Sequence, residues 1–84
     1  MTNTKAAIVW VEEVVDNVIL FFRSSFPELW KEYLTQERQN HEIDGQLSAK
    51  LRSVLRVKFP GKNSVEIGLL ILRIRVKTIE DLDQ

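Results

Sequence analysis

The chain has 84 residues, of which 44% are hydrophobic and 29% are charged, a composition that fits one small globular domain over residues 1–84 rather than a disordered chain. Twelve Lys and Arg residues balance twelve Asp and Glu residues, so a formal net charge of zero does not indicate a protein that coats polyanions. The chain has no cysteine, which excludes disulfides, thiolate metal sites and cysteine nucleophiles.

The first predicted element is an amphipathic helix over residues 4–23. Its apolar side chains fill one broad side at a spacing of three or four residues, while its charged side chains gather on the other. The high valine content is typical of strands, but the polar residues recur every three or four positions and not every two. The spacing therefore predicts a helix.

A second helix is predicted over residues 26–39, after a break in the pattern. Ser25 and Glu28 have the spacing of a capping box, and Pro27 is tolerated in a first helical turn because the amide it lacks would have no partner there. The side chains expected to face inward are Leu29, Trp30, Tyr33 and Leu34.

Residues 43–59 fit two periods. Alternation of apolar and polar residues would suit a strand, whereas the length and the Leu, Ala, Lys and Arg content favour a helix. Asp44 is a plausible N-cap for that helix, and Pro60 and Gly61 end the segment.

The last segment, residues 64–82, is rich in β-branched residues, and a hairpin with the preceding segment is the alternative to a helix. A strand would have to change face near Leu70, while a helix has only Leu70 and Arg75 out of place. Asn63 and Glu66 also have capping-box spacing. We therefore predict an all-α, small antiparallel four-helix domain; the alternative is an α+β fold, with two N-terminal helices packed on a C-terminal β-hairpin.

The residues that could carry chemistry are few. His41 is the single histidine, and its neighbours Glu37, Glu42 and Asp44 make a poor metal site without further strong ligands. The serines have no nucleophile motif, and the three glycines form no phosphate-binding loop. We expect no catalytic residue, no metal, no cofactor and no enzymatic activity.

Charge is divided unevenly along the chain. Residues 1–42 contain seven acidic and four basic side chains, whereas residues 45–79 contain eight basic side chains and one acidic one. The favoured interpretation is that the acidic half offsets the basic half within the domain or a dimer. The alternative is a nucleic-acid-binding regulator. Its possible phosphate contacts are Lys50, Arg52, Arg56, Lys58, Arg73, Arg75 and Lys77.

The functional expectation rests on a surplus of apolar residues. In residues 65–79 they cover about 260° of a helix, more than one neighbouring pair of helices can bury. We expect a protein–protein interaction module, an adaptor or assembly factor that forms a homodimer or larger oligomer. With no apolar run near the ~20 residues that span a bilayer and no signal-peptide pattern, we expect it to be soluble and cytoplasmic, without membrane contact. The predicted partner-binding residues are Trp10, Phe21, Leu69, Ile71, Leu72 and Val76.

Overall fold

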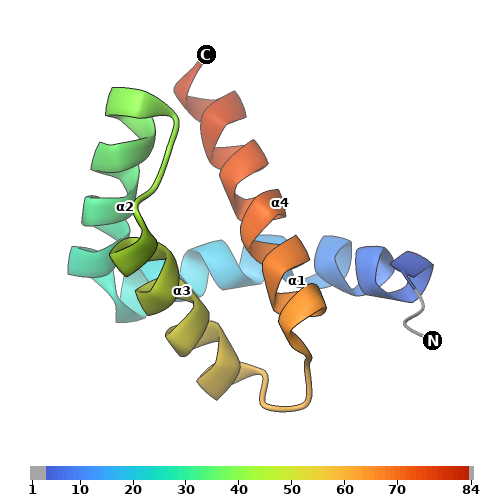
Figure 1. The fold of residues 1–84 in the computed structure, drawn as a ribbon. Helices are drawn as coiled ribbons and strands as arrows, with labels where there is room; N and C mark the ends of the chain where they lie inside the picture. Colours follow the sequence, from blue (N-terminus) through green and yellow to red (C-terminus); the bar gives the residue numbers. More distant parts are fainter. Residues whose placement is uncertain (1–3, 84) are drawn as a thin grey trace.

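The computed structural model describes residues 4–83 and consists of four helices joined by short connections (Figure 1). The helices are α1 (Thr4–Ser25), α2 (Pro27–Asn40), α3 (Gly45–Lys58) and α4 (Ser64–Leu82). The described part of the chain contains no strand, so the predicted all-α, four-helix class is confirmed and the hairpin alternative is excluded.

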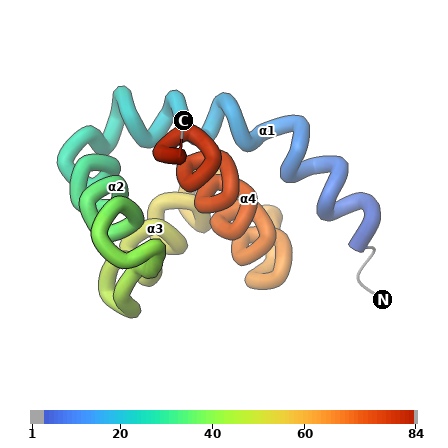
Figure 2. Tube along the Cα trace, turned by 90° about the horizontal axis from the view of Figure 1, so that it is seen from above, coloured from blue at the N-terminus to red at the C-terminus, as the bar shows by residue number. Residues whose placement is uncertain are grey.

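The four helices do not all lie alongside one another. Helix α1 has 22 residues, a length of about 33 Å, and the longest dimension of the molecule is 37 Å. It crosses behind α2 and α4 at a steep angle, whereas α2, α3 and α4 run up, down and up in Figure 1. Seen from above, α2 and α4 point along the line of sight while α1 runs across it (Figure 2). Only α2 to α4 are therefore antiparallel in succession.

The hydrophobic core is built by all four helices around the inner face of α4. Helix α4 packs against each of the other three, and α1 and α2 also pack on each other next to Phe26. The buried apolar core residues that form one cluster are Val11, Val15, Val18, Phe22, Trp30, Tyr33, Leu47, Leu51, Leu55, Ile67, Leu70, Ile71 and Ile74. Leu70 did not fit the predicted apolar face of its helix, but it is fully buried by the surrounding core.

Helices α3 and α4 each begin at a side-chain N-cap. The Asp44 carboxylate accepts a hydrogen bond from the Leu47 amide at 2.8 Å. At the start of α4, the Asn63 side chain accepts from the Glu66 amide at 2.9 Å, and the Glu66 carboxylate accepts from the Asn63 amide at 3.0 Å. Both N-caps were predicted, because an N-cap depends on residues only three positions apart.

The predicted capping box of Ser25 and Glu28 is wrong. Helix α1 continues through Ser25, and the N-cap of α2 is Phe26, whose side chain makes no capping hydrogen bond. The Phe26 amide still donates to the Phe22 carbonyl at 2.9 Å. An N-cap side chain works from extended backbone, so a serine that belongs to the last turn of the preceding helix cannot fill that role.

Candidate functional site

Helix α4 carries an apolar stripe on the side that faces away from the core. We define the α4 stripe as Val65, Leu69, Leu72, Val76 and Ile79, which follow one another at intervals of four, three, four and three residues. Val65 is 57% exposed, Leu72 56% and Val76 44%, while Leu69 and Ile79 at the edges are half-buried. Intervals of four and three are the heptad spacing of helices that pair along a seam.

Ile71 was predicted to bind a partner together with Leu69, Leu72 and Val76, but the structure places it elsewhere. Ile71 is only 6% exposed and belongs to the core, next to Leu70 and Ile74. It cannot contact a partner while the domain is folded, so its inclusion among the partner-binding residues is corrected. Leu69, Leu72 and Val76 are the predicted apolar residues that α4 brings together.

Trp10 and Phe21 lie apart from the α4 stripe, against the C-terminal end of α3. The Trp10 ring makes an edge-to-face contact with Phe59, with the ring centroids 5.2 Å apart. The Lys58 ammonium lies 4.0 Å from the centroid of the Phe21 ring. Both aromatic side chains are half-buried, so they serve the contact between α1 and the end of α3.

The basic residues on α4 face acidic residues of the first two helices. The Arg73 guanidinium lies 2.7 Å from the Glu12 carboxylate, and the Lys77 ammonium lies 2.7 Å from the Asp16 carboxylate. Arg75 pairs with a carboxylate of α2, described below. These pairs place the acidic N-terminal half against the basic C-terminal half within one chain, as the favoured interpretation of the charge pattern expects.

The predicted phosphate contacts on α3 have different surroundings. The Lys50 ammonium lies 3.7 Å from the Glu32 carboxylate, with both side chains largely exposed. The Arg56 guanidinium donates to the Ser64 hydroxyl at 3.2 Å, and Arg52 lies beside α4. A phosphate would therefore compete with existing partners at Lys50 and at the three basic residues of α4.

A buried carboxylate is the main polar feature that the sequence did not predict. The Glu37 side chain is fully buried, and its Oε1 accepts a hydrogen bond from the Nε of Arg75. The same guanidinium donates to the His41 carbonyl at 2.9 Å. Burial raises the pKa of the neighbouring Tyr33 hydroxyl well above its usual range. Glu37 follows Tyr33 by four residues, so the inward helical spacing would have identified it.

Three residues of the possible metal site have structural roles in the fold. Glu37 pairs with Arg75, Asp44 caps α3, and His41 ends α2 in a left-handed conformation with φ of 54°. Within residues 4–83, no group of three or more His, Asp or Glu side chains is arranged to hold a metal ion.

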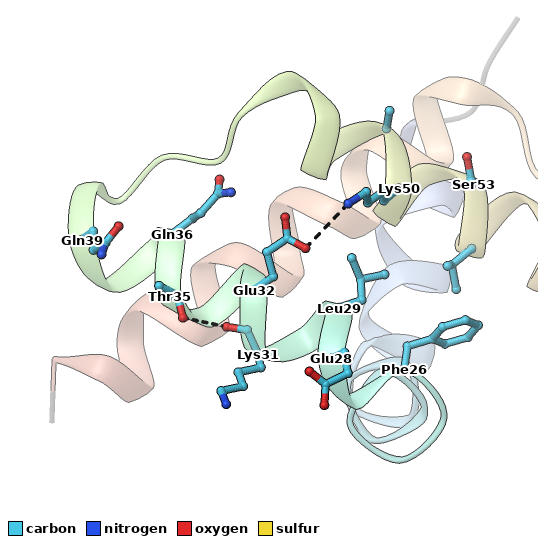
Figure 3. Close-up of a pocket in the computed structure, with 12 residues that line it drawn as sticks. Phe26, Glu28, Leu29, Lys31, Glu32, Thr35, Gln36, Gln39, Lys50 and Ser53 are labelled. Carbon is cyan, nitrogen blue, oxygen red and sulfur yellow. Dashed lines mark hydrogen bonds and ion pairs between the residues drawn. The ribbon is translucent and has the colours of Figure 1, made fainter.

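An open groove of about 1070 Å³ runs between α2 and α3. Leu29 points into it beside Phe26 at one end, and the ion pair of Glu32 and Lys50 bridges the two helices (Figure 3). Phe26 and Val54 also line an adjoining apolar hollow with Val57, which is 83% exposed on α3. This groove is the second candidate contact surface of the domain. Its lining contains both charged and apolar side chains, whereas the α4 stripe contains only apolar ones.

Comparisons with protein-family models, with curated proteins and with solved structures found no match to this chain. Among the helices of the described residues, none combines the length and the apolar character needed to cross a membrane.

Proposed function

We propose that this protein is a non-enzymatic, self-associating interaction module, and that the α4 stripe is its contact surface with a second copy. The observation that carries the proposal is the exposure of Val65, Leu72 and Val76 along one line of a helix whose opposite side forms the core. Burying these side chains against another copy would remove apolar area from water, which is the main driving force of association.

A second copy suits the stripe because the heptad spacing is self-complementary: two such helices can interlock their side chains along a common seam. Association also adds to the stability of a small domain, which buries a limited fraction of its surface alone. Binding of nucleic acid ranks second, since Lys50, Arg73, Arg75 and Lys77 already pair with carboxylates.

The test is sedimentation equilibrium of the wild type and two glutamate variants over a wide range of concentrations. Leu72→Glu places a charge in the proposed seam and should raise the dissociation constant at least about tenfold. Val57→Glu is the matched control, because Val57 is also an exposed aliphatic residue but lies on α3, outside the α4 stripe. Both variants should keep the helical circular dichroism spectrum.

A wild type that remains monomeric at high micromolar concentration would contradict the proposal. Dissociation by Val57→Glu with no effect of Leu72→Glu would move the contact surface to the groove between α2 and α3.

A further inference from the structure

The charges beside the α4 stripe distinguish the ways in which two copies of α4 can pair; this inference rests on the proposed function. On the flank nearer α1 lie Glu66 and Arg73, and on the other flank lie Gly68 and Arg75. We propose that α4 pairs with the partner's α4 in the antiparallel direction, about a two-fold axis between Leu69 and Leu72.

In this arrangement Leu69 lies opposite the partner's Leu72, and Val65 lies opposite the partner's Val76. An antiparallel two-fold places like flanks together, so Glu66 faces the partner's Arg73, and this contact of opposite charges occurs twice. The Arg73 side chain is 32% exposed, and its Nε lies 2.7 Å from the Glu12 carboxylate. The Glu66 side chain is 18% exposed; its carboxylate accepts from the Asn63 amide and lies 3.4 Å from the Lys62 ammonium, so the contact with the partner would add to these contacts within the chain.

The competing arrangements are less favourable in charge. An antiparallel pairing shifted by one heptad would place Arg73 opposite the partner's Arg73 and Glu66 opposite the partner's Glu80, and like charges repel. A parallel pairing would bring Arg75 toward the partner's Glu80, but two nitrogens of the Arg75 guanidinium already bind the buried Glu37 and the His41 carbonyl, whereas Arg73 pairs through Nε with the exposed Glu12. Antiparallel helices also set opposite ends of their dipoles side by side, which is the favourable direction.

Because the chain has no cysteine, the direction can be tested with two single-cysteine variants, Val65→Cys and Val76→Cys. In the antiparallel pair, residue 65 lies next to the partner's residue 76, whereas the two copies of residue 65 are roughly 16 Å apart, since eleven residues each rise about 1.5 Å. A short bismaleimide should therefore cross-link the mixture of the two variants and leave each variant alone uncross-linked. One variant is labelled with ¹⁵N so that mass spectrometry identifies mixed dimers, and Val57→Cys is the control for random collision.

The outcomes separate this inference from the proposed function. Cross-linking of each variant with itself would show a parallel pair and overturn the antiparallel direction, while self-association through α4 would stand. No cross-link in a protein that sediments as a dimer would overturn the α4 interface. A monomeric wild type would overturn the proposed function and this inference together.

A second variant tests the charge contact. Glu66→Gln keeps the hydrogen-bonding group that a capping box requires but removes the charge, so α4 should keep its start. The dimer dissociation constant should rise roughly 2- to 10-fold, as expected for two partly exposed ion pairs, and its dependence on salt should weaken. Glu13→Gln, at an exposed site on α1, should have no effect. An unchanged dissociation constant in Glu66→Gln would overturn the contact between Glu66 and the partner's Arg73.

Discussion

At the scale of single residues, the buried pair of Glu37 and Arg75 ties α2 to α4. The Glu37 side chain has no exposed area, and the Arg75 side chain is 24% exposed. A carboxylate removed from water requires a partner of opposite charge, and removing one member of such a pair leaves the other uncompensated. This pair therefore constrains how α4 is placed on α2, in addition to the apolar contacts of the core.

Replacing Glu37 by Gln should lower the free energy of unfolding by about 2–3 kcal/mol, because the partly buried Arg75 guanidinium loses its counter-charge. Urea denaturation monitored by circular dichroism measures the loss. Glu12→Gln is the matched control: Glu12 also pairs with an arginine of α4, but its side chain is 51% exposed, and the loss should stay below about 1 kcal/mol. Equal losses in the two variants would contradict the role assigned to burial.

Acid should weaken the start of α3 through Asp44. The hydrogen bond from the Leu47 amide holds the pKa of the Asp44 carboxyl below its usual value. A pKa that is lowered on folding stabilises the native state above the unfolded value of about 3.9, and this contribution is lost as the pH falls through the folded pKa. Asp44→Asn keeps an N-cap acceptor without the titration. Its unfolding free energy should fall less than that of the wild type between pH 7 and pH 3; equal falls would contradict this prediction.

At the scale of helices, α2 and α4 begin in different ways. Helix α4 begins with a complete capping box, whereas α2 begins at Phe26 without any capping side chain. Helix α2 instead follows α1 directly, and the Trp30 amide donates to the Phe26 carbonyl at 2.9 Å. The start of α2 therefore depends on packing of the aromatic side chains of the core around Phe22 and Trp30, whose rings stack at 5.9 Å.

Asn63→Ala should lower the free energy of unfolding by about 1 kcal/mol, because the Glu66 amide loses its acceptor at the start of α4. Thermal or urea unfolding measures this change. Asn17→Ala is the control, since Asn17 is exposed in the middle of α1 and alanine is the better helix former there. A loss in Asn17→Ala as large as that in Asn63→Ala would show that the cap is not the cause.

At the scale of the whole molecule, ion pairs between α1 and α4 and between α2 and α4 join an acidic half to a basic half. These ion pairs occupy basic side chains that could otherwise bind a polyanion. The apolar α4 stripe lies between flanks that carry charged residues. The proposed association of two copies through this stripe would link association to stability, because a partner that binds only the folded state stabilises it.

The midpoint of thermal unfolding should therefore rise with protein concentration in the wild type, by mass action. In Leu72→Glu the midpoint should depend less on concentration than in the wild type, since the weakened dimer is less populated at each concentration. Differential scanning calorimetry or fluorimetry at several concentrations measures this. A wild-type midpoint that stays constant from low to high micromolar concentration would contradict a dimer linked to folding.

The amino-acid sequence by itself determined where the helices lie and how two of them start. Helix periodicity and the caps at Asp44 and Asn63 depend on side chains within a few positions of one another, so they can be predicted without the tertiary structure. The break after Ser25 was predicted, but not that Ser25 remains inside α1. The surplus of apolar residues on α4 was also visible in the sequence.

Only the tertiary structure decided which apolar side of α4 faces the core. Periodicity fixes the angle of each side chain about its own helix, but when apolar residues cover most of the circumference it does not say which arc a neighbouring helix covers. Ile71 and Leu72 are adjacent in sequence, yet Ile71 is 6% exposed and belongs to the core, while Leu72 stays 56% exposed. The burial of Glu37 likewise depends on Arg75, 38 residues away, because a charge becomes acceptable in a core only when a partner from elsewhere in the chain reaches it.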